Sequence, residues 1–165
     1  MSVQEELTGT ELTGMELAAW RMFLRAHATV TRRLEAELVA EHELPLASYD
    51  VLVQLSEAPE RQLRMTELAD RVLLSRSGLT RLADRLERDG LIRRQACPSD
   101  ARGTLAVLTD DGLAKLRQAW PTHRRGVAEH VTGRLTGDEV AQLARLLGKL
   151  VGDGPLPEDA CDGKR

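Results

Sequence analysis

The sequence is poor in aromatic residues, which make up only 2% of its 165 positions. Its core must therefore be built from leucine, valine and alanine, as in helical proteins. Two cysteines, Cys97 and Cys161, are too few for a disulfide framework. No apolar run approaches the roughly 18 residues of a membrane-spanning helix, and the first residues lack the features of a secretory signal. We therefore expect a cytoplasmic protein with a single core.

The chain also lacks a strong net charge, because its formal charge is only −3. Taken over the whole chain, that value argues against a nucleic-acid-binding protein. Between Arg61 and Arg102, however, there are ten arginines and six acidic residues, a net charge of +4, which leaves −7 for the rest of the chain. A basic segment on an acidic body predicts DNA binding better than the overall charge does.

Motifs of common enzymes are absent too. The sequence has no nucleophile elbow, no P-loop and no dinucleotide fingerprint, and we find no catalytic set. His123 and His130 are seven residues apart with Glu129 beside the second. A metal site there is conceivable, but the spacing is not that of a zinc motif. We therefore expect no enzyme activity, no cofactor and no metal.

Residues 75–90 have the pattern of an amphipathic helix with a cap at each end. Ser75 can act as the N-cap, and Gly90 follows the last turn, where a left-handed residue is needed. The apolar positions recur with helical spacing, at Leu79, Leu82, Ala83 and Leu86. The opposite face carries Ser77, Thr80, Arg81, Asp84, Arg85 and Arg88. Hydroxyl and guanidinium groups contact phosphates and base edges, so this face is suited to the major groove.

A second, shorter helix precedes this one. It starts at Thr66 as a plausible N-cap and has Leu68, Ala69 and Val72 on one side. The turn of residues 73–75 is short enough only for a direct corner between two helices. Gly78 near the start of the second helix suggests either close approach to DNA or a crowded helix crossing. The alternative to a DNA-reading pair is an ordinary helical hairpin in a bundle.

A β-hairpin follows the two helices. Residues 91–96 and 104–108 have extended character, and residues 97–103 between them are rich in turn formers. Arg102 beside Gly103 could enter a minor groove, and Asp100 could pair with Arg93 or Arg94 to brace the tip. The alternative is a solvated loop with incidental charge. Two helices and a basic hairpin together predict a winged helix-turn-helix.

These motifs resemble the MarR (multiple antibiotic resistance regulator) family of transcription factors. The family pattern has Ser-x-Ser-x-x-Thr-Arg, then Arg-Leu-Glu-x-x-Gly-Leu, Asp-x-Arg and Leu-Thr-x-x-Gly. The matching segments, in that order, are residues 75–81, 85–91, 100–102 and 108–112. The resemblance extends over roughly residues 15–151. Cys97 departs from the pattern, because the family often has an acidic residue before the proline.

The resemblance implies a mainly α fold, with a small β-hairpin wing and long N- and C-terminal dimerisation helices. We expect dimerisation segments at 15–44 and 110–151, a winged helix-turn-helix at 45–109, a disordered arm at 1–14 and a flexible tail at 152–165. Such a homodimer would bind double-stranded DNA at an inverted repeat with half-sites about 10 bp apart. The expected DNA-binding residues are Ser75, Arg76, Ser77, Gly78, Thr80, Arg81, Arg85, Arg93, Arg94, Asp100 and Arg102.

The terminal segments have apolar stripes that call for a partner. One stripe runs through residues 15–41, and another follows Thr136, which has capping-box spacing to Glu139. Between them Thr109 can cap a further helix, and Pro121 would kink or break that helix. We expect Leu24 and Leu147 to contribute to a dimer interface.

Regulation by a small molecule is also implied by the resemblance. A helix near residues 47–56 should pack between the dimer helices and the DNA-reading part, where the family often binds an anionic or aromatic ligand. Trp20, Phe23, His27, Tyr49 and Val51 are candidates for the pocket lining, although residues of this kind more often belong to a core. The predicted function is a dimeric, sequence-specific repressor that such a ligand releases from DNA.

Other functions are kept as alternatives. One is an architectural DNA-binding protein with little sequence preference, and another is a helical interaction module that binds no DNA. A third is a redox-responsive regulator, because arginines near Cys97 would favour a reactive thiolate. Family members that sense oxidants have their cysteine near the start of the first helix, where this chain has none, so a structural Cys97 is the simpler interpretation.

Overall fold

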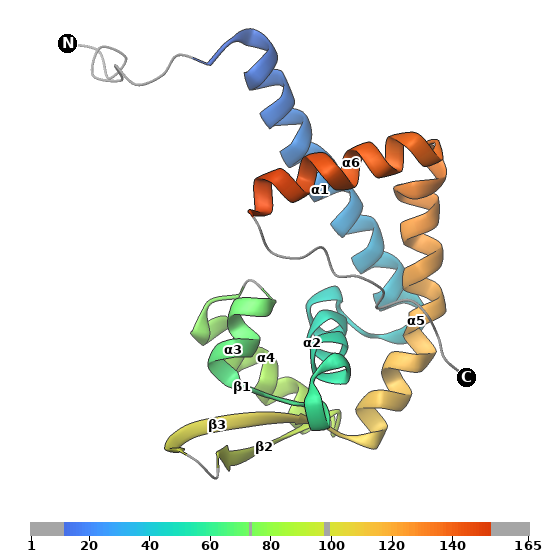
Figure 1. Ribbon diagram of the computed structural model, residues 1–165. Coiled ribbons are helices and arrows are strands. Elements are labelled where there is room, and N and C mark those ends of the chain that lie inside the picture. Colours follow the sequence, from blue (N-terminus) through green and yellow to red (C-terminus); the bar gives the residue numbers. More distant parts are fainter. Residues whose placement is uncertain (1–11, 73, 98–99, 153–165) are drawn as a thin grey trace, which may run out of the picture.

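The computed structural model describes residues 12–72, 74–97 and 100–152, and the side chains of 100–102 lie outside that description. The helices are α1 (Gly14–His42), α2 (Leu46–Glu57), α3 (Met65–Arg71), α4 (Arg76–Arg88), α5 (Asp110–His130) and α6 (Gly137–Val151). The strands are β1 (Gln62–Arg64), β2 (Ile92–Cys97) and β3 (Asp100–Leu108). The expected mainly α fold with a β-hairpin wing is confirmed (Figure 1). The expected arm and tail fall almost entirely on residues outside the description, as does Leu73 of the expected turn.

The hydrophobic core lies where α2, α3 and α4 meet the sheet. It takes in the last turns of α1 and the first half of α5 through Leu38, Leu116 and Ala119. The helical spacing seen in the sequence is responsible, since the α4 residues in this core are Leu79, Ala83 and Leu86. The wing and α4 are thereby fixed to one packed unit.

Much of α1 and all of α6 lie outside this core. The first turns of α1 project beyond the other elements (Figure 1), and the buried residues of α1 are Leu34 and Leu38. No residue of α6 is buried. Their exposed large apolar side chains are Met15, Trp20, Met22, Phe23, Leu24, Val39, Leu143, Leu146, Leu150 and Val151. The predicted apolar stripes are therefore uncovered in the single chain.

Both predicted ends of α4 are confirmed. The Ser75 hydroxyl accepts a hydrogen bond from the Gly78 backbone N–H at 3.1 Å. At the other end Gly90 has a φ of +74°. The backbone N–H groups of Gly90 and Leu91 return to the carbonyls of Glu87 and Leu86 at 3.0 and 2.9 Å, the hydrogen bonds of a Schellman motif. A glycine is needed there because other residues tolerate this left-handed conformation poorly.

Thr109 joins the wing to α5. Its hydroxyl lies 2.7 Å from the Gly90 carbonyl and 3.0 Å from that of Leu91, and it accepts from the Gly112 N–H at 3.0 Å. A Cβ on Gly112 would lie 2.0 Å from the Leu91 carbonyl oxygen and 2.8 Å from the Leu108 side chain. The Leu-Thr-x-x-Gly motif is thus a close junction between β3, the start of β2 and α5.

The sheet has the strand order β1-β3-β2, and both pairings are antiparallel. Arg93 pairs with Val107 and Ala96 with Thr104, and the register shifts between Ala96 and Cys97. The sequence did not predict β1, and β3 begins at Asp100, inside the segment expected to be a turn. The wing strands are therefore longer than expected.

Three helix boundaries also bear on the predictions. Helix α3 starts at Met65 rather than Thr66, and its N-cap Arg64 makes no side-chain cap hydrogen bond. Helix α5 continues through Pro121, so the proline does not break it. The capping box of α6 is confirmed, because the Thr136 N–H donates to Glu139 at 2.8 Å and the Glu139 N–H donates back at 3.4 Å.

Polar contacts tie α1 to its two neighbours. Helix α2 begins after Pro45 without a cap of its own, and the Glu35 carboxylate of α1 accepts from the Leu46 N–H instead. Further along α1, Glu41 accepts from the Thr122 hydroxyl of α5 at 2.8 Å. That hydroxyl is also 2.8 Å from His42 Nε2. Because the hydroxyl proton goes to Glu41, His42 must donate from Nε2.

Candidate nucleic-acid interface

The polar face of α4 is exposed. Ser75, Arg76, Ser77, Thr80, Arg81, Arg85 and Arg88 are all exposed. Ser77, Arg81 and Arg85 follow one another at intervals of four, so they lie on the same side of the helix. Among the described residues, none of Arg76, Arg81 and Arg85 has an ion-pair partner. Their guanidinium groups can therefore meet phosphates or guanine edges without breaking an internal contact.

Thr80 and Gly78 on this face both make contacts within α4 and its N-cap. The Thr80 hydroxyl donates to the Arg76 carbonyl at 2.9 Å, so in this rotamer it offers only its lone pairs to a ligand. A Cβ on Gly78 would lie 3.1 Å from the Ser75 hydroxyl oxygen, and no described atom of another element lies within 4 Å of it. Gly78 therefore leaves room for the N-cap, and a crowded helix crossing is not the reason for it.

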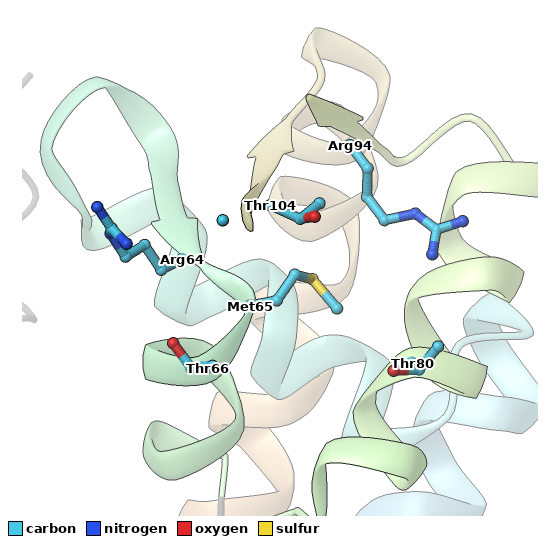
Figure 2. A pocket seen from close by; sticks show the side chains of 7 residues that line it. Arg64, Met65, Thr66, Thr80, Arg94 and Thr104 are labelled. Carbon is cyan, nitrogen blue, oxygen red and sulfur yellow. The ribbon is translucent and has the colours of Figure 1, made fainter. Parts of the chain in front are cut away.

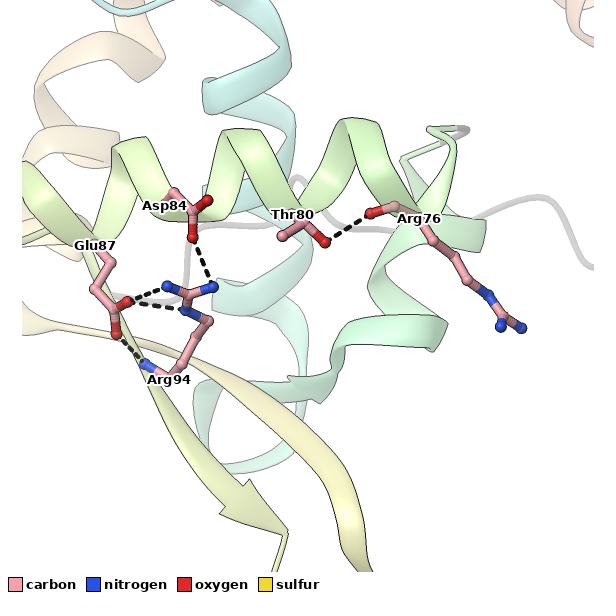
Figure 3. Close-up of polar contacts among 5 residues, drawn as sticks. All are labelled: Arg76, Thr80, Asp84, Glu87 and Arg94. Atoms are coloured by element: carbon pink, nitrogen blue, oxygen red, sulfur yellow. Dashed lines mark hydrogen bonds and ion pairs between the residues drawn. The ribbon is translucent and has the colours of Figure 1, made fainter.

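Arg94 of β2 connects the wing to α4 (Figure 3). Its guanidinium binds Asp84 at 2.8 Å and Glu87 at 2.6 Å, and its backbone N–H also donates to Glu87 at 2.8 Å. Hydrogen bonds from the Arg94 side chain and backbone lower the pKa of Glu87, and the same Glu87 contact raises the pKa of Arg94. This contact sets the position of the wing relative to the helix.

These contacts change the interpretation of Arg94. It was predicted to contact DNA or to pair with Asp100, but two α4 carboxylates already compensate its charge, and we assign it a positioning role. Asp84 and Glu87 were not predicted as its partners. Glu87 stands in the Arg-Leu-Glu-x-x-Gly-Leu motif, which could have suggested a structural role. Arg93, the preceding residue on the strand, is exposed. The Asp100 and Arg102 side chains, predicted for the wing tip, lie outside the described residues.

A cavity of about 450 Å³ lies between the start of α3, the middle of α4 and the wing (Figure 2). Its lining comprises Arg64, Met65, Thr66, Thr80, Arg94, Gly103 and Thr104. Of its polar groups, the Thr80 hydroxyl already donates to the helix backbone, and Asp84 and Glu87 compensate the charge of Arg94. The cavity borders the same face of α4 that carries the exposed arginines.

The predicted ligand-binding residues do not come together in one pocket. Trp20 and Phe23 stack on each other with ring centroids 6.1 Å apart, and they are 53% and 42% exposed. Tyr49 is only 2% exposed and stacks on His123 with centroids 4.5 Å apart. Val51 is also in the core. For Tyr49 and Val51 the alternative interpretation as core residues is confirmed.

His27 lines a different, open hollow between α1 and α2. The hollow measures about 530 Å³, and its lining comprises His27, Ala28, Thr31, Arg32, Glu35, Leu46, Ala47 and Asp50. Partial desolvation, together with the nearby Glu35 charge, raises the pKa of Asp50 to about 6. The acidic pair Glu35 and Asp50 was not predicted from the sequence, because the two residues belong to different helices.

Cys97 is buried, and the two candidate metal-binding histidines have different neighbours. Cys97 is buried and clusters with Leu105 and Val107, which favours the structural interpretation over the redox one. Burial lowers the pKa of His123, which packs on Tyr49. His130 instead pairs with Glu37 at 2.5 Å, so the two histidines do not form one site.

A short helix, a tight corner, an exposed capped helix and a braced β-wing define a winged helix-turn-helix DNA-binding protein. A sequence profile described as MarR family matches residues 42–103. The HTH-type transcriptional regulator YkoM of Bacillus subtilis is 32% identical over 79% of this chain and 82% of its own length. The chain belongs to the MarR family, and it is a transcriptional regulator rather than an enzyme.

Solved structures of the same family agree with this assignment. Sco3205 of Streptomyces coelicolor, a MarR family regulator in complex with DNA, is 37% identical with a TM-score of 0.81, over 93% of this chain and 96% of its own. A mutant MarR of Escherichia coli complexed with operator DNA is 28% identical with a TM-score of 0.76, over 87% of this chain and 100% of its own.

In the described part of this chain no helix is long and apolar enough to cross a membrane.

Proposed function

We propose that the chain is a homodimeric repressor that binds an inverted-repeat operator through α4 and the wing, and that a small ligand releases it. The observation that carries the proposal is the row Ser77, Arg81 and Arg85 on an exposed helix face, where the arginines have no ion-pair partner among the described residues. Arginine can bind guanine in a bidentate manner, so this row supplies sequence preference as well as affinity.

The uncovered apolar surface supports the homodimer. Both terminal helices expose large apolar side chains, including Leu24 in α1 and Leu146 in α6. An extended apolar surface of this kind in a water-soluble helix marks an interaction site. A two-fold partner would cover it and would place two α4 helices about one DNA turn apart, which fits an inverted repeat.

The two hollows support release by a ligand. The cavity beside α4 borders the helix face that carries the exposed arginines, so a ligand bound there would compete directly with DNA. A ligand between α1 and α2, near His27, would instead change how α1 packs against α2, and α2 belongs to the same core as α4. We favour an anionic or aromatic ligand, as the family resemblance implies.

The deciding experiment is a fluorescence-anisotropy titration at near-physiological salt. The protein is titrated into DNA from upstream of its own gene and into a shuffled duplex of equal length. We expect the first duplex to bind about a thousandfold or more tightly than the second. Equal affinity for both would favour the architectural alternative, and no binding to either would favour the protein-interaction module.

Two arginine variants test the roles of helix and wing. Arg81→Ala should weaken operator binding and reduce the preference for the operator by about 1–3 kcal/mol, because a base contact is lost. Arg102→Ala should weaken binding to operator and shuffled DNA more evenly. The same anisotropy titration measures both, with thermal melting as the control for folding. Unchanged binding by both variants would refute this interface.

A further inference from the structure

A second group of polar side chains lies far along the α1–α5 contact, away from α4 and the wing. Glu37 comes from α1, and Glu129 and His130 come from the last turn of α5. One potential ligand atom from each of the three lies within 4.8 Å of those of the other two. His130 is the most enclosed, with a side chain 8% exposed, whereas Glu129 faces solvent.

Two atoms of this group are buried without hydrogen-bond partners. His130 Nε2 contacts Glu37 Oε1 at 2.5 Å, but His130 Nδ1 and Glu37 Oε2 have no partner among the described residues. Leaving a buried polar atom unsatisfied costs about 1–3 kcal/mol, and a bound ion can remove that cost by taking the place of the missing partner. The pair therefore has two polar atoms, His130 Nδ1 and Glu37 Oε2, that could act as ligands for an ion.

The backbone around the group favours a cation. Glu129 and His130 are the last two residues of α5, where the helix dipole places partial negative charge. Gly126, one turn earlier, lets the Glu37 carboxylate approach, because a Cβ there would lie 2.6 Å from Glu37 Oε2. A cation also lies close to the group, because the Arg134 guanidinium donates to the Glu129 backbone carbonyl at 3.2 Å.

We propose that Glu37, Glu129 and His130 form a binding site for a divalent transition-metal ion of the Zn²⁺ class, which joins α1 to α5. One imidazole and two carboxylates are ligands that Zn²⁺ accepts, and the exposed side leaves room for water. Ligand atoms about 2.0–2.1 Å from a tetrahedral Zn²⁺ are about 3.3 Å apart, so small side-chain rotations suffice.

The test is a ZnCl₂ titration of chelator-treated protein in competition with a chromophoric chelator. Wild type should bind one Zn²⁺ per protomer, and Glu129→Gln should bind it at least about tenfold more weakly. Because Glu129 is exposed, this variant should fold normally. His130→Gln should remove binding, with circular dichroism as the check on folding. Co²⁺ in place of Zn²⁺ should give visible absorption bands in wild type that Glu129→Gln loses.

Two matched variants control for surface binding. Glu57→Gln removes an exposed carboxylate at the end of α2, and His27→Gln removes an exposed imidazole in the α1–α2 hollow. Both control variants should bind Zn²⁺ with the wild-type affinity. Zn²⁺ should raise the melting temperature of each control by more than it raises the melting temperature of Glu129→Gln. No Zn²⁺ binding by wild type, equal affinity in Glu129→Gln, or a loss confined to His27→Gln would overturn the proposal. The assay contains no DNA, so its outcome is independent of the proposed repressor function.

Discussion

Gly112→Ala should destabilise the protein, although alanine is the better helix former. Gly112 is the third residue of α5, and a helix interior gains about 1 kcal/mol when glycine becomes alanine. The new Cβ, however, would lie 2.0 Å from the backbone oxygen of Leu91, which no side-chain rotation relieves. Forcing extra volume into a packed site costs about 1–3 kcal/mol. If α5 moves away from Leu91 to relieve the clash, the Thr109 hydrogen bonds to Gly112 and Leu91 weaken as well, and each contributes about 1 kcal/mol to stability.

The net expectation is a loss of about 2–4 kcal/mol in the free energy of unfolding. Urea denaturation followed by circular dichroism at fixed protein concentration measures it. The matched control is Gly137→Ala at the first residue of α6, where a Cβ meets nothing within 4 Å. That variant should be unchanged or more stable by up to about 1 kcal/mol. A Gly112→Ala protein as stable as the control would refute the close junction between the wing and α5.

Three further predictions concern the brace, the apolar surface and the acidic pair. Arg94→Ala should lower both the melting temperature and DNA affinity, whereas Arg93→Ala should lower affinity alone; equal melting temperatures would contradict the brace. Leu24→Glu or Leu147→Glu should weaken dimers, and light scattering that shows intact dimers would reject this interface. Asp50 has a folded-state pKa of about 6, above its ordinary value. Its contribution to stability is therefore present in acid and is lost as the pH rises between about 4 and 6. Asp50→Asn should raise the free energy of unfolding near neutral pH, by an amount that solvent screening reduces, and should make it less dependent on pH. Urea midpoints that vary with pH as they do in wild type would contradict this.

Local signals in the sequence predicted the N-terminal caps of α4, α5 and α6 and the C-terminal end of α4. Ser75, Thr109 and Thr136 form N-caps because each hydroxyl reaches a backbone N–H only three residues away. Gly90 ends α4 for an equally local reason, its positive φ. The apolar spacing in α4 likewise predicted which side is buried. Such features depend on the nearest residues, so they can be inferred without knowing the fold.

Features that depend on residues far apart in the chain were missed. β1 is three residues long and is a strand only because it pairs with β3. The brace at Arg94 and the contact of Glu37 with His130 each join two elements, and the contact joins positions 93 residues apart. The sequence offered Asp100 as a partner for Arg94, whereas the fold brings Asp84 and Glu87 of α4 to it. The surroundings of the candidate pocket residues were likewise not evident from the sequence, since Tyr49 is in the core whereas Trp20 is exposed on another helix.

Helix α2 is capped by a side chain of α1, and this has a consequence for the order in which the protein folds. Helices α4, α5 and α6 each supply their own N-cap side chain, whereas the first backbone N–H of α2 is bound by Glu35 of α1. A helix of 12 residues is marginal in isolation. The start of α2 can therefore be completed only after α1 has docked. In kinetic terms, we expect the reading helix to form early and Glu35→Ala mainly to accelerate unfolding, with a φ-value near zero.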